Sequence, residues 1–234
     1  MKQENWIACL PYYLLVVIIL IGMIVGGDRV VSVVAENQVI KQAHCVVIDA
    51  GHGGVDGGAT SCTGVLESQI NLEIALRLDD LLHLMGYKTI MIRKTDISVY
   101  TKGDTIAAKK ISDLKERVRI VNETDGALLI SIHQNTFSDS RYGGAQVFYP
   151  GTDGSAELAN AMQKALIRFL NPDSNRQSKR GEGIYLLEHI NQPGVLIECG
   201  FLSNPEEEAK LRDGAYQKQF CAVIASVISG YFCA

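Results

Sequence analysis

Residues 45–54, CVVIDAGHGG, indicate the fold class of this 234-residue chain. The stretch begins as a short apolar run rich in β-branched residues and closes on glycines, which is typical of a strand buried on both faces. The next regular segment, Ser68 to Met85, repeats apolar residues at three- and four-residue spacing, and Gly86 follows as a stop. A buried strand followed by an amphipathic helix predicts an α/β fold.

The same alternation of strand and helix continues to the end of the chain. Further strands are predicted at 88–92, 127–132, 145–149, 184–187 and 195–199, and further helices at 114–121, 158–169 and 216–231. Because strands alternate with helices, we expect one α/β domain with a mainly parallel sheet flanked by helices. Residues 97–113 are weakly patterned, and we expect a functional or mobile loop there.

Four ionisable side chains stand where these elements begin or end: His52, Glu67, His133 and Glu198. In an open α/β sheet the ligand crevice lies outside the carboxyl ends of the strands, so residues distant in sequence converge there. Two imidazoles and one carboxylate make a ligand set for a catalytic zinc with a fourth position for water, and a further carboxylate would carry protons. Taken singly, Glu67 is explained as a first-turn acid and His133 as a core histidine. Glu198 ends an apolar run, where an acid is costly unless it is hydrogen-bonded, paired or bound to metal.

Five other polar residues are weaker candidates for ligand support or substrate binding. The aspartates would orient a ligating imidazole, or, for Asp56, shape the glycine-rich turn. The arginines would hold an acidic group of the substrate or, more simply, the protein's own carboxylates. The set is Asp49, Asp56, Arg93, Arg117 and Asn135.

The net charge and the composition of the N-terminal segment limit the class of protein to which the chain can belong. The chain carries 26 acidic and 22 basic residues, for a net charge of -4, which gives no support for a basic nucleic-acid-binding surface. Residues 6–25 are almost wholly apolar, about the length of a helix that spans a membrane. We therefore expect a signal peptide or membrane anchor over 1–27, a linker over 28–43, and one exported domain over 44–234.

The six cysteines are expected to be free thiols rather than disulfides. Cys45, Cys199 and Cys221 lie within core-like patterns, where a free cysteine behaves as a small hydrophobe. A cysteine hydrolase with Cys199 or Cys62 as the nucleophile and a histidine as base is an alternative. That alternative leaves both glutamates without a role.

Separated motifs in a fixed order resemble those of a known enzyme family. They are VVIDAGHGGVDGGA, LESQINLEIALRL, IRKTD, LKERVRIVN, SIHQN and VLIECGFLSNPEEE, and they cover about Cys45 to Phe232. The set resembles the zinc-dependent N-acetylmuramoyl-L-alanine amidases of the type-3 amidase family. The resemblance implies a single α/β domain with a central mixed sheet, and hydrolysis of the amide between N-acetylmuramic acid and the L-alanine of the peptidoglycan stem peptide.

The resemblance also implies roles for individual residues and a biological setting. His52, Glu67 and His133 correspond to the ligands of one Zn²⁺, and Glu198 corresponds to the catalytic acid. The apolar N-terminal segment and residues 101–114 are most similar to the germination-specific, sporulation-associated subgroup. That subgroup prepares spore cortex for muramic δ-lactam formation together with a deacetylase. The implied place is the outer face of the membrane or the cell wall, including the forespore intermembrane space, with an accessory protein as a further partner.

Two other functions remain open at this point. A metallopeptidase would use the same ligands to cut between amino acids of the stem peptide. A wall-binding protein without catalysis would keep the fold, although the intact ligand set argues against it.

Overall fold

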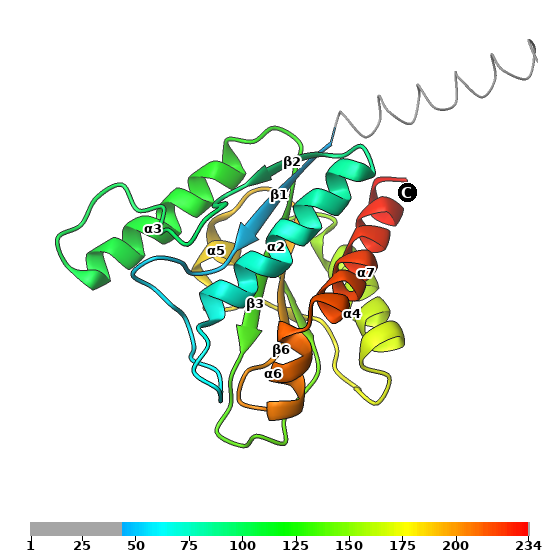
Figure 1. Cartoon of the computed structure of the whole chain (residues 1–234). Coiled ribbons are helices and arrows are strands. Elements are labelled where there is room, and N and C mark those ends of the chain that lie inside the picture. Colours follow the sequence, from blue (N-terminus) through cyan, green and yellow to red (C-terminus); the bar gives the residue numbers. More distant parts are fainter. Residues whose placement is uncertain (1–43, 234) are drawn as a thin grey trace, which may run out of the picture. The chain divides into compact units, whose positions relative to one another are not determined.

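The computed structural model describes residues 44–233, so the predictions for residues 1–27 and 28–43 lie outside the described part (Figure 1). The elements are β1 (Cys45–Ala50), α2 (Glu67–Leu84), β2 (Lys88–Met91), α3 (Ile106–Asn122), β3 (Ala127–Asn135), β4 (Gln146–Tyr149), α4 (Ser155–Leu170), β5 (Lys179–Arg180), α5 (Tyr185–His189), β6 (Gly194–Phe201), α6 (Pro205–Arg212) and α7 (Gly214–Phe232).

The six strands form one mixed sheet in the order β2-β1-β3-β6-β4-β5. Strands β2, β1, β3 and β6 are parallel, whereas β4 runs antiparallel to β6 and β5 pairs parallel with β4. The expected α/β class and mixed, mainly parallel sheet are therefore confirmed. The carboxyl ends of the three inner parallel strands lie at one edge of the sheet, which is the edge where ligands bind in such folds.

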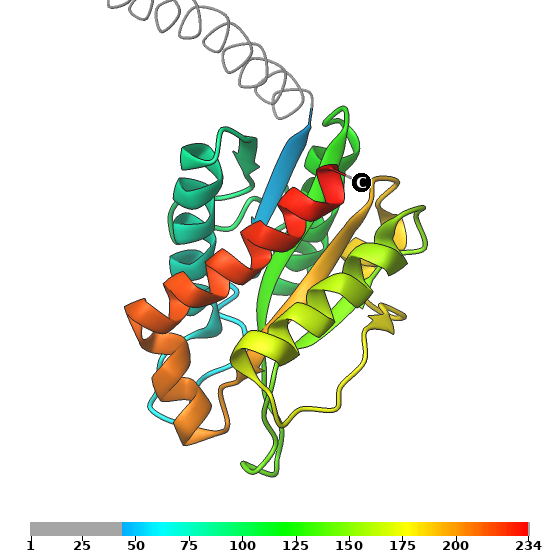
Figure 2. The same ribbon diagram turned by 90° about the vertical axis from the view of Figure 1, so that its right-hand side faces the viewer.

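Helices cover both faces of the sheet, and the residue alternation along each strand divides the core in two. Helices α2, α4 and α7 cover one face, where α7 lies across the strands between α2 and α4 (Figure 2). Val46 and Ile48 of β1 point into that core. Val47 of β1 points instead into the smaller core on the other face, which Leu186 and Leu187 of α5 complete. Strands buried on both faces explain the continuous apolar runs of the sequence.

Two local predictions were wrong. Residues 184–187 were expected as a strand, but they begin the short helix α5, because a short apolar run carries no periodicity that separates strand from helix. Residues 97–113 were expected as a loop, but α3 already begins at Ile106, and the Thr105 side chain caps it by accepting a hydrogen bond from the amide of Ala108. The sequence also gave no prediction of α6, which Asn204 caps and Pro205 begins.

No two of the described cysteines are joined by a disulfide; they are Cys45, Cys62, Cys199, Cys221 and Cys233. Among residues 44–233, no helix combines the length and the apolar character needed to cross a membrane.

Candidate metal centre

The register of the sheet brings the predicted residues together at its carboxyl edge. Ala50 of β1 pairs with Ile132 of β3, and the next residue, His133, pairs with Glu198 of β6. Successive side chains of a strand point to opposite faces. Because Ile132 faces the larger core, His133 points to the face that carries α3 and α5. Glu198 points to the same face, since its neighbours Ile197 and Cys199 both belong to the larger core.

Three side chains converge in front of these strand ends. The Oε1 atom of Glu67 lies 3.1 Å from Nδ1 of His133 and 3.4 Å from Nε2 of His52. One donor atom from each of the three residues lies within 4.8 Å of the others, so the group is able to hold a metal ion. Glu67 reaches this position because it is the first residue of α2, where its carboxylate also suits the positive end of the helix dipole.

The glycine-rich loop after β1 sets the orientation of His52. His52 has a left-handed backbone with φ of 61°, which is uncommon outside glycine and is often stored at functional sites. Its Nδ1 atom lies 3.0 Å from Oδ2 of Asp56, which leaves Nε2 directed toward Glu67. Lys110 of α3 pairs with the other oxygen of Asp56 at 2.8 Å. A carboxylate on the far nitrogen is the arrangement that fixes ligating imidazoles in metalloproteins.

Backbone and amide donors hold the carboxylate of Glu67 in place. The amide of Ala59 donates to Oε2 at 2.9 Å, and the amide of Gln134 donates to Oε1 at 3.1 Å. The side chain of Asn71, one turn further along α2, donates to Oε1 at 3.2 Å. The carboxylate is therefore fixed before any ion binds, a pre-organisation that favours tight coordination.

The charges of the cluster suit a cation. Burial by itself lowers the pKa of His52, but hydrogen bonds and charges from Glu67 and Asp56 outweigh it and raise that pKa to about 9. Burial opposes ionisation of Glu67, yet the two imidazoles outweigh it and hold the pKa of its carboxyl well below the ordinary value. A divalent ion replaces the proton in such a site. Two imidazole nitrogens and one carboxylate oxygen are the donor set of a catalytic zinc site, so the residues present fit Zn²⁺.

Glu198 stands next to the cluster without belonging to it. It lies directly opposite His133 on the neighbouring strand, and its Oε2 atom is buried and has no hydrogen-bond partner among the described residues. Burial raises the pKa of Glu198 to about 7, a trend that His133 opposes and the Glu67 charge reinforces. A buried, unpartnered carboxyl beside a metal site is typical of a group that exchanges protons with water or substrate.

Comparison with known proteins agrees with this geometry. Residues 46–229 match the family model described as N-acetylmuramoyl-L-alanine amidase. The chain belongs to this amidase family. It is an N-acetylmuramoyl-L-alanine amidase, an enzyme that hydrolyses the amide between muramic acid and the stem peptide of peptidoglycan.

Individual relatives resemble the amidase in sequence and in structure over most of its length. It is 39% identical over 189 residues to the germination-specific N-acetylmuramoyl-L-alanine amidase of Bacillus subtilis, an alignment that covers 80% of this chain and 79% of the relative. Its structure matches the CwlD amidase of Clostridioides difficile in complex with the GerS lipoprotein, with TM-score 0.77, 39% identity, and coverage of 81% and 98%. It also matches an N-acetylmuramoyl-L-alanine amidase of Clostridium difficile 630, with TM-score 0.71, 30% identity, and coverage of 82% and 98%.

Two buried arginines of the amidase, Arg93 and Arg117, hold the backbone around the site in place through hydrogen bonds. Arg93 is almost completely buried and donates only to backbone carbonyls, those of Ala50, Gly51, Ser68 and Thr95. It therefore ties the end of β1 to the start of α2, which are the two segments that carry His52 and Glu67.

Arg117 of α3 braces the same strand end through charge. It pairs with Asp49 and Asp113, and it donates to the carbonyls of Ala50 and His52. Asp49 contacts Arg117 and Ser131 rather than an imidazole, so of the two predicted aspartates only Asp56 touches a histidine.

Asn135, the last of the weaker candidates, lies at the end of β3 outside the ligand cluster. Its side-chain oxygen accepts from the amide of Thr136 at 2.7 Å. Lys110 and Asn71 were missed by sequence reasoning. Asn71 faces Glu67 at the four-residue helical spacing, which was a readable signal, whereas nothing in the sequence pairs Lys110 with Asp56.

A substitution at Gly51 of the amidase tests how closely the His133 ring packs against the backbone. A Cβ at Gly51 would lie 2.2 Å from Nε2 of the His133 ring. We expect Gly51→Ala to displace this imidazole and to lower zinc affinity about 10- to 100-fold, as the loss of ligand support does. Competition with a chromophoric chelator measures the affinity. Gly230→Ala, where nothing lies within 4 Å of the added carbon, is the control and leaves zinc affinity unchanged. Equal affinities for both variants would contradict the packing described here.

Proposed function

We propose that this amidase uses one Zn²⁺ ion held by His52, Glu67 and His133, with Glu198 as the group that moves protons. The observation that carries the proposal is the convergence of one donor atom from each ligand within 4.8 Å, beside a buried carboxyl with no partner. Zinc in such a site supplies a Lewis acid that polarises a carbonyl and lowers the pKa of water toward ~7.

The chain's own residues divide the remaining work. Glu198 takes the proton of the attacking water and passes it to the amine of L-alanine that leaves. His133 and Glu67 would hold the ion close to this carboxyl, because His133 and Glu198 are partners across two hydrogen-bonded strands. Asp56 keeps Nε2 of His52 free for the metal by holding Nδ1. Arg93 and Arg117 keep the strand end that carries His52 from moving.

Cys199 as the nucleophile is disfavoured by the same structure. Cys199 is buried on the face opposite His133, and burial raises the pKa of its thiol well above the ordinary value. A reactive cysteine needs a lowered pKa and access to solvent. The cysteine hydrolase considered from the sequence therefore has no support in the arrangement around Cys199.

The biological substrate we propose is spore cortex peptidoglycan. Identity of 39% to a germination-specific amidase supports this assignment. Cleavage then removes stem peptides from muramic acid residues that a deacetylase converts, with ring closure, to the δ-lactam. The enzyme would act outside the cytoplasm, in the wall or the forespore intermembrane space, with residues 1–27 as its anchor or export signal. A complex between the CwlD amidase and the GerS lipoprotein supports an accessory protein as a partner here too.

Metal removal combined with product analysis tests this proposal. We expect chelator-treated protein to release no peptide from purified cortex, and one equivalent of Zn²⁺ to restore release. Mass spectrometry should find muramic acid without peptide, and free peptides that begin with L-alanine. Undiminished activity of metal-free protein would refute the role of zinc. Cleavage between two amino acids of the stem peptide would favour the metallopeptidase alternative instead.

A further inference from the structure

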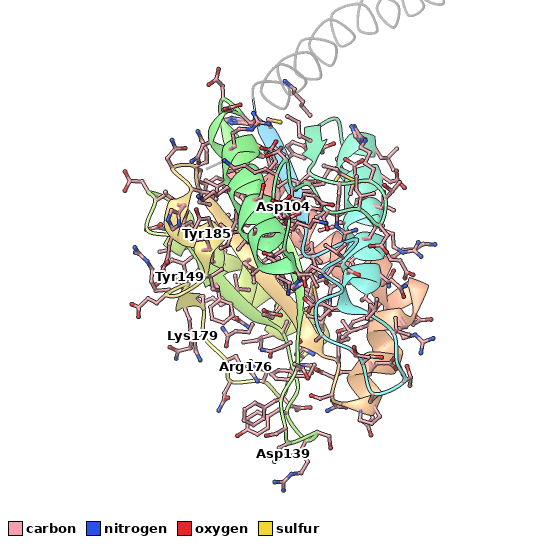
Figure 3. All side chains as sticks on the ribbon, turned by 90° about the vertical axis from the view of Figure 1, so that its left-hand side faces the viewer. Asp104, Asp139, Tyr149, Arg176, Lys179 and Tyr185 are labelled. Carbon is pink, nitrogen blue, oxygen red and sulfur yellow. The ribbon has the colours of Figure 1, made fainter. Side chains whose placement is uncertain are left out.

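A groove next to the strand that pairs with the Glu198 strand has no role in the reaction described above. Its volume is about 1060 Å³, and it runs between the β3–β4 loop, the segment after α4, and α6. Its lining includes Arg141, Gln146, Arg176, Lys179, Glu207 and Lys210. Figure 3 shows Arg176 and Lys179 along one side of the strands, above Asp139 at the tip of the β3–β4 loop. The lining residues Asp139, Arg141, Tyr142 and Gly143 belong to the β3–β4 loop.

The pairing of strands β4 and β6 connects the groove to Glu198. Gln146, which lines it, lies directly opposite Glu198 in the antiparallel β4–β6 ladder. The β3–β4 loop that forms one wall leaves β3 two residues after His133. A chain held in the groove is therefore one strand away from the carboxyl that moves protons. Neighbouring strands lie only ~5 Å apart, which the first residues of an extended peptide span easily.

Hydrogen bonds and one cation–π contact hold the walls of the groove in place. Arg176 donates from Nε to the carbonyl of Gly143 at 3.1 Å, and its guanidinium stacks 5.0 Å from the ring centre of Phe201. Glu207 accepts from the amides of Gly144 at 2.6 Å and Phe201 at 2.8 Å. These contacts join the loop, the segment after α4 and the end of β6 into one surface.

The charge that remains on this surface is positive. Glu207 is occupied by backbone amides, and Asp139 by Arg141. Arg176, Lys179 and Lys210 form no ion pair with any residue in 44–233. Asp173 is the one carboxylate of the groove without a partner among the described residues. The lining holds four cations, on Arg141, Arg176, Lys179 and Lys210, and three carboxylates, on Asp139, Asp173 and Glu207. The resulting net charge of +1, with three cations outside the ion pairs that the structure describes, favours an anionic ligand.

We propose that this groove binds the stem peptide of peptidoglycan through the peptide's free carboxylates. The inference rests on the proposed function, in which the stem peptide is the leaving group. The stem peptide carries free carboxylates beyond its L-alanine, whereas the glycan strand of the substrate has no comparable series of negative charges. A peptide that extends from the scissile amide past Glu198 reaches the cations of the groove.

Charge reversal in the groove tests the proposal. Lys179→Glu combined with Lys210→Glu should raise KM for wall peptidoglycan about 5- to 30-fold and change kcat less than about twofold, because two exposed charge contacts are lost and reversed. Lys164→Glu with Lys218→Glu makes the same change of charge at exposed positions outside the groove, and it should leave KM unchanged. The paired Lys→Arg variants at 179 and 210 should keep the wild-type KM.

Modified substrate identifies the ligand. Amidation of the peptide carboxylates with carbodiimide and ammonia should raise KM of the unsubstituted enzyme and remove its difference from the charge-reversed variant. Cosedimentation of walls with proteins that also carry Glu198→Gln measures the same binding without turnover, so the groove is tested even if the proposed chemistry fails. A binding deficit that survives amidation overturns the proposal. So does a deficit that disappears only when wall phosphopolymers are stripped, because these would then be the ligand.

Discussion

Glu198→Gln is expected to lower kcat on peptidoglycan by about 10³-fold, within the range that a lost general acid or base costs. The substitution keeps the size of the side chain and removes the group that accepts the proton of water. The ligand cluster does not include Glu198, so zinc content should stay at the wild-type level. The assay is release of new amino termini from purified walls, with elemental analysis of the same protein.

Folding should not explain the loss of activity. The Oε2 atom of Glu198 has no hydrogen-bond partner among the described residues, so an amide in its place breaks no contact. The free energy of unfolding should change by less than about 1.5 kcal/mol. Glu157→Gln in the first turn of α4 is the matched control, and it should keep full activity. Activity of Glu198→Gln near the control level would remove this carboxyl from the mechanism.

Arg117→Met is expected to destabilise the protein by about 3 to 5 kcal/mol, the usual cost when one partner of a buried ion pair is removed. Arg117 and Asp49 are both almost fully buried, so the variant leaves a carboxylate in the core with Ser131 as its remaining side-chain partner. The hydrogen bonds to the carbonyls of Ala50 and His52 are also lost. Urea unfolding of metal-free protein measures the change without the contribution of zinc.

The pH dependence of the stability difference between wild type and Arg117→Met separates the effect of the Arg117 charge from the effect of its packing. Burial opposes ionisation of Asp49, but Arg117 and His133 outweigh it, together with the hydrogen bond from Ser131, and lower its pKa. The stability from this depressed pKa is present above the unfolded value of about 3.9 and is lost as pH falls through the lower folded value. The gap between wild type and Arg117→Met should therefore shrink below about pH 4. Adding Asp49→Asn to Arg117→Met should recover part of the loss at neutral pH. A deficit that is independent of pH would assign the effect of Arg117 to packing alone.

Residue patterns were sufficient for the parts of the fold that depend on local periodicity. Apolar runs and helical stripes predicted β1, β2, β3, β4 and β6 and the four long helices. Prediction failed where periodicity is absent. The run at 184–187 is too short to distinguish helix from strand, and the start of α3 depends on the cap at Thr105. Those failures lie in the segments that border the smaller core and the site.

The sequence by itself determined that two imidazoles and one carboxylate stand at the ends of strands and a second carboxylate at the start of a helix, and that this set suits a metal. Which atoms meet was decided by the tertiary structure. The pairing of β3 with β6 places His133 beside Glu198, and the left-handed turn at His52 lets Asp56 reach Nδ1 while Glu67 faces Nε2. These contacts join residues distant in the chain, and strand register and loop closure fix them only when the whole core is packed.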